Sequence, residues 1–274
     1  MNDGNPHQHE PPQMNATGRL RYVATAGVGI IVIDNPQKRN AMSVAMWHSL
    51  AEILNTTAND PSVRCLMIRG DGTKAFCAGA DIDEKQQVGV EVATANTNVA
   101  LGCLRMLRDF KKPVVALISG YCVGAGMALS LACDIRIAAA NSSFGIPAAK
   151  LGVGYYFSEL KQLADVIGMA RAKQMVFTAE RIPAERALQI DLVHEVVSDE
   201  QLEDFAMAIV NRIATNAPLT IASAKRTLAA VRSNALKHEI EDCDAQARAC
   251  LCSEDYAEGR VAFREKRTPV FKGC

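Results

Sequence analysis

The most informative stretch of this sequence is GYCVGAGMAL at residues 120–129, where a glycine-rich turn joins a strand to a helix. The aliphatic run at 114–118 predicts the buried strand before it, and the apolar helix after it should end near Cys133. Glycines let the backbone turn sharply and approach another group closely. Because a helix N-terminus presents unpaired N–H groups and the positive end of a dipole, this turn suits an anion or an oxygen that becomes one.

A second segment of small residues, AFCAGADI at 75–82, follows another predicted strand at 63–68. Taken singly, each segment is equally well explained by tight packing of a helix on a strand. Two such segments in one chain, at this spacing, are much more specific than either segment alone.

Further predicted strands lie at 28–33 and 135–139, each a β-branched or aliphatic run. Ser43 is expected to cap a helix that runs to about Thr57, and the polar stretch 83–98 is expected to be a loop before a helix at 99–110. Ser198 and Gln201 form a predicted capping box. Strands separated by helices predict a mainly parallel sheet.

From Ser158 onward the pattern is mostly helical. The expected helices lie at 158–167, 170–178, 184–189, 200–214, 218–231 and 237–251, and a last helix is capped by Ser253 and ends at Glu265.

The composition is that of an ordinary globular protein, with 274 residues, 49% of them hydrophobic and 22% charged. The 30 basic and 30 acidic residues balance, so no diffuse basic field for nucleic acid is expected. No apolar run has the length of a membrane span. The nine cysteines, odd in number and without a CxxC pair, favour a reducing cytoplasm over a disulfide framework or a metal site. The polar residues 1–18 are expected to form a disordered tail, in which Met14 is an alternative start.

The sequence lacks the short motifs of several other enzyme classes. It contains no GxGxxG or P-loop for nucleotides, no GxSxG turn for serine hydrolysis and no HExxH for zinc. The chemistry must therefore be sought in the two glycine-containing segments.

Taken together, these segments resemble the crotonase family, the enoyl-CoA hydratase/isomerase superfamily, over about 27–273. The resemblance implies an α/β fold, a crotonase-like spiral of ββα units at 19–198, followed by a C-terminal helical region at 199–274 that assembles homotrimers or homohexamers. It implies an acyl-CoA thioester substrate, as in fatty acid metabolism, and no cofactor or metal besides the CoA of the substrate. The motifs that carry it are KRNAM at 38–42, FCAGADI at 76–82, KPV at 112–114, GYCVGAG at 120–126, CDI at 133–135, FG at 144–145, LG at 151–152, and a tail from SEDYAEG at 253–259 to AFREKR at 262–267.

In this family two backbone N–H groups form an oxyanion hole for the thioester oxygen, and by position these belong to Ala80 and Ala125. Such donors stabilise an enolate, and one donor is worth roughly 3–4 kcal/mol in known cases. The basic residues Lys38, Arg39 and Lys266 are candidates for binding CoA, and the alternative for each is a solvated surface charge. The CoA contacts implied by the resemblance are Ala78, Gly79, Asp81, Ile82 and Asp83, Lys38 or Arg39 near the phosphates, and Phe263 and Lys266 at the nucleotide end, reaching over from a neighbouring subunit.

The chain departs from the hydratase pattern at both acid positions. Hydratases of this family activate water with two glutamates, and the corresponding places here are Ala128 and Ala148. Alanine exchanges no proton, so ordinary hydration is disfavoured, as is isomerisation through an acid at the second place. An atypical hydratase and a catalytically silent acyl-CoA-binding protein remain as alternatives.

Two other side chains are candidates for the missing proton chemistry. The stretch AKLGVGY at 149–155 is similar to methylmalonyl-CoA decarboxylase-like members, which place a tyrosine where Tyr155 stands but a histidine where this chain has Ala80. Decarboxylation starts without a base, so a tyrosine suits it. Glu159 is the other candidate base, provided that it faces an apolar pocket. The alternatives are packing alone for Tyr155 and an exposed first-turn carboxylate for Glu159.

Overall fold

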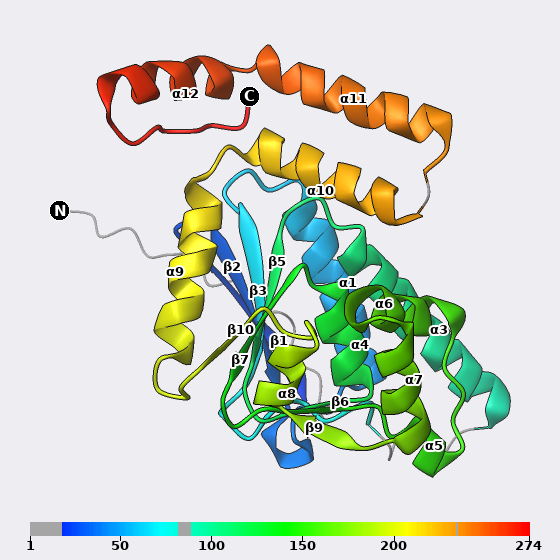
Figure 1. Cartoon of the computed structure of the whole chain (residues 1–274). Coiled ribbons are helices and arrows are strands. Elements are labelled where there is room, and N and C mark those ends of the chain that lie inside the picture. Colours follow the sequence, from blue (N-terminus) through cyan, green and yellow to red (C-terminus); the bar gives the residue numbers. More distant parts are fainter. Residues whose placement is uncertain (1–17, 82–88, 234) are drawn as a thin grey trace.

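The computed structural model describes residues 18–81, 89–233 and 235–274, and its centre is a six-stranded sheet (Figure 1). The strand order is β1-β2-β3-β5-β7-β10, with β1 antiparallel to β2 and the other neighbours parallel. The predicted mainly parallel arrangement is therefore confirmed, whereas β1 and β10 were not predicted. The strands are β1 (Arg19–Thr25), β2 (Val28–Asp34), β3 (Cys65–Gly70), β5 (Val114–Ile118), β7 (Ile135–Ala139) and β10 (Glu195–Val197).

A second, smaller sheet has the order β4-β6-β8-β9. Its strands have only three residues each, and all but β9 run parallel to their neighbours. Both glycine-containing segments start from this sheet. The strands are β4 (Ala75–Cys77), β6 (Tyr121–Val123), β8 (Ser143–Gly145) and β9 (Arg181–Pro183).

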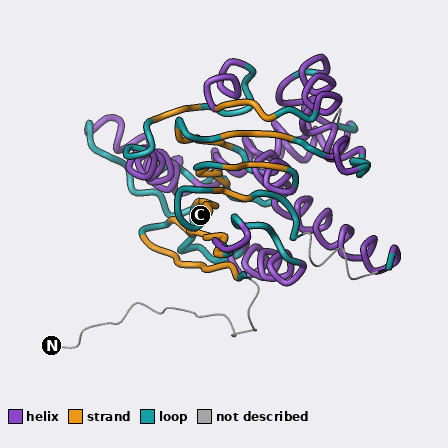
Figure 2. Tube along the Cα trace, turned by 90° about the horizontal axis from the view of Figure 1, so that it is seen from below, coloured by secondary structure: helices purple, strands orange, loops and turns teal. Residues whose placement is uncertain are grey.

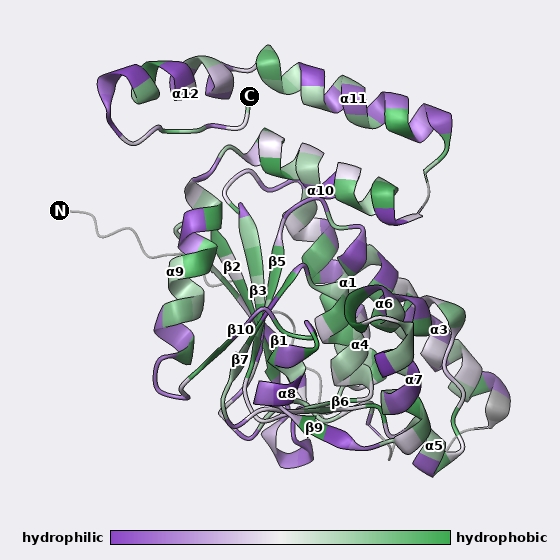
Figure 3. Ribbon diagram, viewed as in Figure 1, coloured by the Kyte–Doolittle hydropathy of each residue, from purple (hydrophilic) through white to green (hydrophobic). Residues whose placement is uncertain are grey.

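Helices cover both faces of the main sheet, as the view turned by 90° shows (Figure 2). Side chains of a strand alternate between the two faces, so neighbouring residues enter different cores. On β3, Met67 packs in one core with Ala206 and Val210 of α9, while Leu66 and Ile68 pack in the other with α1, α3 and α4. Strands buried on both faces are hydrophobic along their length (Figure 3).

The helices agree with the sequence patterns at most positions. The Ser43 hydroxyl accepts the N–H of Met46, and Ser253 accepts that of Tyr256, so both predicted caps are confirmed. The helices are α1 (Val44–Ala58), α3 (Val90–Arg108), α4 (Ala125–Ala132), α5 (Ala148–Leu151), α6 (Phe157–Ile167), α7 (Met169–Thr178), α8 (Ala184–Gln189), α9 (Leu202–Thr215), α10 (Pro218–Ser233), α11 (Lys237–Leu251) and α12 (Glu254–Glu265), besides a 3-10 turn at Pro36–Lys38.

Two local predictions were wrong. The predicted loop at 83–98 is helical from Val90 onward, because α3 packs along α1 and this contact supports a polar segment that has no strong pattern of its own; residues 83–88 lie outside the described residues. The capping box is absent. Gln201 is itself the N-cap of α9, and its N–H donates to the Ser198 carbonyl at 3.1 Å in a preceding turn.

The last three helices project from one end of the sheet (Figure 1). Helices α10 and α11 pack as a hairpin, and α12 follows α11. The tail then returns along α12, where the buried Asp255 carboxylate accepts the N–H groups of Lys272 at 2.7 Å and Gly273 at 3.0 Å. Within the described ranges, no helix combines the length and apolarity needed to cross a membrane.

Candidate active site

The small sheet brings the two glycine-containing segments together. Because β4 and β6 are parallel neighbours, the residues that follow them leave the same edge of the sheet. A Cβ built on Gly124 would lie 3.7 Å from the Cα of Gly79, and a Cβ on Gly79 would lie 3.7 Å from the Val123 carbonyl oxygen. The turns after the two strands are therefore in contact.

The first unpaired donor is the N–H of Ala80, which follows β4. Ala80 forms a single parallel bridge with Met42: the Met42 N–H donates to the Gly79 carbonyl at 2.9 Å, and the Asp81 N–H donates to the Met42 carbonyl at 2.9 Å. In such a pairing the N–H of the middle residue points away from the partner strand. Among the described residues, no hydrogen bond is donated by the Ala80 N–H.

The second donor is the N–H of Ala125, the first residue of α4. The helix begins sharply because Gly124 has φ 56° and ψ −114°, a conformation that favours glycine. The first N–H groups of a helix lack partners within it, and here Ala128 is the first to donate back, to the Gly124 carbonyl at 3.1 Å. No acceptor for the Ala125 N–H occurs in the described part of the chain.

Gly126 fixes how closely α4 approaches β4. A Cβ on Gly126 would lie 2.2 Å from the Cys77 carbonyl oxygen, so this position has no room for any side chain. The structure thus places two unpaired N–H groups on adjacent, tightly packed turns. Donors arranged in this way can stabilise an oxygen that gains negative charge.

The residues predicted to bind CoA around the first segment are partly engaged with one another. The Lys38 ammonium donates to both carboxylate oxygens of Asp81, at 3.0 and 2.7 Å, and the Asp81 side chain is buried. The Ala78 N–H donates to the Arg39 carbonyl at 3.1 Å, while the Arg39 guanidinium lies over the Tyr121 ring. Ile82 and Asp83 lie outside the described residues.

The structure does not bring Phe263 and Lys266 to this site within one chain. Phe263 lies in the last turn of α12 and Lys266 directly follows this helix, which lies beside α11 and on the far side of α10 from the small sheet (Figure 1). Phe263 is 86% exposed. Their predicted contact with CoA stays a prediction and requires a neighbouring copy of the chain.

Tyr155 is partly buried and packs against the large hydrophobic core that includes Ala128 and Ala148. Burial, and secondarily the Glu159 charge, raises the pKa of Tyr155 to about 12. Its hydroxyl therefore stays protonated at neutral pH and is able to donate. Ala128 and Ala148 are buried and offer no polar group.

Glu159 lies in the first turn of α6, as predicted, and one of its oxygens accepts the Tyr156 N–H at 3.1 Å. This hydrogen bond caps the helix and is typical of an acidic residue at that position. The side chain is neither fully buried nor fully exposed. The observed hydrogen bond shows that Glu159 caps α6, and its role as a base stays a prediction.

Two features near the site and elsewhere were not predicted. Gln162, on α6 against α4, is buried, and its side-chain amide nitrogen has no hydrogen-bond partner in the described ranges. A lone glutamine in a helical pattern gives no signal of this.

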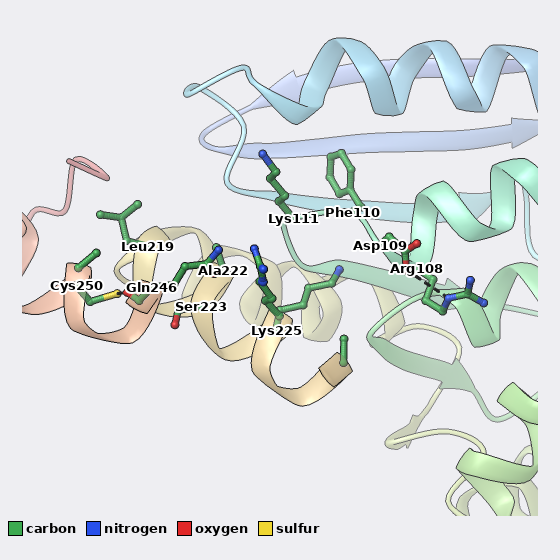
Figure 4. Close-up of a pocket in the computed structure, with 13 residues that line it drawn as sticks. Arg108, Asp109, Phe110, Lys111, Leu219, Ala222, Ser223, Lys225, Gln246 and Cys250 are labelled. Atoms are coloured by element: carbon green, nitrogen blue, oxygen red, sulfur yellow. Dashed lines mark hydrogen bonds and ion pairs between the residues drawn. The ribbon is translucent and has the colours of Figure 1, made fainter. Parts of the chain in front are cut away.

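A cavity of about 480 Å³ lies away from the Ala80–Ala125 pair, between the end of α3 and the helices α10 and α11 (Figure 4). Its lining includes Phe110, Leu219, Lys225 and Cys250.

Comparisons with known proteins agree with this architecture. The family model described as enoyl-CoA hydratase/isomerase matches residues 24–274. The short-chain-enoyl-CoA hydratase of Clostridium acetobutylicum is 32% identical, covering 88% of this chain and 92% of that protein. The methylmalonyl-CoA decarboxylase of Escherichia coli is 33% identical, covering 93% and 98%.

Among solved structures, the enoyl-CoA hydratase from Bacillus anthracis superposes with a TM-score of 0.89 at 32% identity, covering 93% of this chain and 99% of that one. The predicted crotonase-like α/β fold is thereby confirmed. Matches to the family model and to relatives of more than 30% identity extend over nearly the whole chain, so this protein belongs to the enoyl-CoA hydratase/isomerase family.

Proposed function

We propose that the protein acts on an acyl-CoA thioester through an enolate whose oxygen accepts hydrogen bonds from the Ala80 and Ala125 N–H groups. The observation that carries this proposal is that the Gly79 and Gly124 turns are in contact and that each is followed by an N–H group with no acceptor among the described residues. Cleaving a bond at the carbon next to a thioester puts negative charge on the carbonyl oxygen. Fixed donors stabilise that charge without reorganising, at roughly 3–4 kcal/mol for one donor.

The reaction we favour is decarboxylation, or an isomerisation, rather than standard hydration. The two places where the family resemblance puts glutamates hold buried Ala128 and Ala148, which exchange no proton. In a decarboxylation the bond between the α-carbon and the carboxylate breaks, carbon dioxide leaves, and the electron pair forms the enolate. One proton must then reach the α-carbon, which is the only proton transfer required.

Tyr155 is our first candidate for handling that proton. It packs against the cluster that contains both alanines, and its raised pKa keeps the hydroxyl protonated. Glu159 is the second candidate, since its charge is close enough to raise the Tyr155 pKa. The similarity to the Escherichia coli decarboxylase supports this reading, while the similarity to hydratases supports an atypical hydration as the second candidate function.

We further propose that residues 199–274 assemble trimers or hexamers, and that the protein works in the cytoplasm. Large apolar side chains of the C-terminal helices are exposed, among them Leu228 at 68%, Val231 at 71% and Phe263 at 86%. Such patches mark interaction surfaces. All nine cysteines are unpaired thiols, the form that a reducing compartment maintains.

The experiment that tests the reaction is mass spectrometry of CoA esters incubated with the protein in deuterated water. Crotonyl-, 3-enoyl-, malonyl- and methylmalonyl-CoA should be compared. We expect loss of carbon dioxide, or deuterium at the carbon next to the thioester, in at least one of them. Added water would instead establish hydration by groups other than Ala128 and Ala148, and binding without any change would favour a catalytically silent acyl-CoA-binding protein.

A further inference from the structure

The cavity of about 480 Å³ beside the end of α3 has a largely apolar wall (Figure 4). Buried Phe110 lines it from the core, Leu219, Ala222 and Ala229 line it from α10, and Ala249 lines it from α11. A cavity of this size lies within the range of small-molecule sites. Because burial of apolar surface is favourable, this wall suits a ligand with an aliphatic body.

The same wall contains a buried hydroxyl that has no partner in the protein. Ser223 of α10 lines the cavity and is only 8% exposed, yet its hydroxyl forms no hydrogen bond with any described residue. Buried hydroxyl groups are normally hydrogen-bonded. The side-chain amide of Gln246 on α11, another lining residue, also lacks a partner in the described ranges. The cavity therefore offers two unused polar groups to a ligand oxygen.

The charges around the cavity are mostly positive. Its basic lining residues outnumber the acidic ones, with Arg108, Lys111, Lys225 and Arg226 against Asp109. Lys225 is paired with Asp134 at 2.7 Å, and Arg226 is paired with Asp242 at 3.0 Å. The exposed Lys111 ammonium forms no ion pair or hydrogen bond in the described part of the chain, so it is a cation that remains open to an anionic group.

We infer that this cavity binds a small amphipathic carboxylate, with its aliphatic chain against the apolar wall and its carboxylate accepting a hydrogen bond from the Ser223 hydroxyl. The positive charge of Lys111 favours the anion. One hydroxyl, one amide and one ammonium suit the two oxygens of a carboxylate better than the larger and more highly charged phosphate. The inference is independent of the proposed reaction, because the cavity shares no residue with the Ala80–Ala125 pair.

The cavity lies on the opposite face of α10 from the exposed apolar surface that we assign to a neighbouring copy. Leu219, Ala222 and Arg226 line the cavity and recur at intervals of three and four residues. At 3.6 residues per turn, Leu228 and Val231 fall on the other side of the same helix. A copy that docks there does not fill the cavity.

The first test is calorimetric titration of the full-length protein with acetate, butyrate, hexanoate and octanoate at low ionic strength. Affinity should rise about four-fold for each added CH₂ group that contacts the apolar wall. Acetate, which has the charge without the chain, should not bind measurably. Octanoate should bind more tightly than 1-octanol, and added salt should reduce that difference because the exposed Lys111 charge is screened.

Two substitutions in the cavity should weaken octanoate binding. Ser223→Ala removes a hydroxyl that makes no bond within the protein, so the fold should be unaffected while affinity falls about ten-fold. Ala222→Trp fills the cavity and should abolish binding. The matched control is Ser233→Ala, which removes an exposed hydroxyl of the same helix outside the cavity and should bind octanoate as the wild type does.

The location of the ligand can be read from cysteine alkylation by iodoacetamide followed by mass spectrometry. Cys250 lines the cavity, whereas Cys252 and Cys274 are exposed thiols outside its lining. Octanoate should slow alkylation of Cys250 and leave that of the other two unchanged. Absence of octanoate binding, or binding that neither protects Cys250 nor responds to Ser223→Ala, would overturn the inference. Binding that occurs only after Leu228→Ser and Val231→Ser separate the copies would also overturn it, because a neighbouring chain would then fill the cavity.

Discussion

Individual glycine residues set the geometry of the candidate site. Gly126 lies so close to the Cys77 carbonyl that a methyl group would meet it at 2.2 Å, and Gly124 holds a backbone conformation unfavourable for other residues. The donors at Ala80 and Ala125 are backbone groups, so their positions depend on this packing rather than on side-chain chemistry. Alanine at position 125 therefore keeps the donor.

Replacing Gly126 with alanine should disturb both stability and activity. The added methyl group forces α4 away from β4, so we expect the free energy of unfolding to fall by about 1–3 kcal/mol, the usual cost of overpacking. Urea denaturation measures this. Gly102→Ala is the matched control, because Gly102 lies within α3 with nothing near its Cβ position, and it should raise stability by about 0.4–1 kcal/mol. Equal stability of the two variants would contradict the packing argument.

Tyr155 and Glu159 can be separated by substitutions that preserve their structural roles. If Tyr155 supplies the proton, Tyr155→Phe should lower kcat by about 10²–10⁴-fold with little change in KM. Since the pKa of Tyr155 is about 12, activity that depends on its protonated hydroxyl should persist through pH 9. The control is Tyr156→Phe, on the exposed neighbour, which should retain wild-type kcat. Similar kcat values for both variants would eliminate Tyr155.

For Glu159, the informative variant is Glu159→Gln. A glutamine oxygen can still accept the Tyr156 N–H that the carboxylate now accepts, so the start of α6 should be preserved and stability should stay near wild type. Loss of turnover at unchanged stability would make Glu159 the base. Full turnover would leave it with the capping role alone.

At the scale of elements, the long apolar runs were predictable and the short strands were not. The predicted strands at 114–118 and 135–139 match β5 and β7, because strands buried on both faces need continuous apolar sequence. The strands β4, β6, β8 and β9 have three residues each, too few to show a period, and they form only because the parallel crossovers bring them together. The glycine turns were visible in the sequence, whereas their contact depends on this unpredicted sheet.

The stability of the fold should depend on pH through His194, which lies directly before β10 and contacts the backbone directly after the first residue of β7. The Nδ1 atom of His194 accepts the Arg136 N–H at 3.1 Å, and burial, followed by the Arg136 charge, lowers the pKa of His194 below its usual 6.5. The unfolded chain therefore binds a proton more readily than the folded one, so stability falls as the pH drops below about 6.5. The ring is partly exposed, which keeps the effect modest.

This pH effect can be isolated by comparing the wild type with His194→Asn, whose side-chain oxygen can still accept the Arg136 N–H. Urea midpoints at pH 7.5 and 5.5 should drop less for the variant than for the wild type. Other groups titrate equally in both proteins, so only the difference between them reports on His194. Identical drops would show that this histidine does not contribute.

Asp255 is one of the residues that hold the tail along α12. Its buried carboxylate accepts two backbone N–H groups, and hydrogen bonds to a charged acceptor contribute about 1.5–3 kcal/mol each. Asp255→Ala should therefore loosen the tail around Lys272 and Gly273, with faster amide hydrogen exchange there than in the wild type. The Glu258 carboxylate, which accepts the Val270 N–H at 2.9 Å, should still hold the preceding part of the tail. The exposed Asp244→Ala on α11 is the control and should leave exchange of the tail unchanged.

At the scale of the whole molecule, the C-terminal helices are incompletely covered by the chain itself. Helix α9 packs on the main sheet, but α10 and α11 carry exposed leucine and valine side chains, and α12 lies farther out (Figure 3). Within the described residues of their own chain, Phe263 and Lys266 do not reach the Ala80–Ala125 pair. A neighbouring copy would cover the apolar surface and give these two residues a site to contact, so assembly and substrate binding would be coupled.

Because of this coupling, loss of the oligomer should weaken the binding of acyl-CoA. Leu228→Ser combined with Val231→Ser replaces two exposed apolar side chains of α10, which are 68% and 71% exposed in the single chain. If these side chains are buried between copies, the substitution removes about 1.5–3 kcal/mol of association free energy per side chain. In sedimentation velocity experiments the sedimentation coefficient should then shift from that of an oligomer toward that of a monomer. Acyl-CoA affinity should fall with it, because Phe263 and Lys266 of the neighbouring copy would be lost from the site. The control is Met169→Gln, 61% exposed on α7 and outside the C-terminal helices, which should alter neither property. A variant that sediments as the wild type does would remove α10 from the interface, and a monomer with full affinity would show that each chain binds acyl-CoA alone.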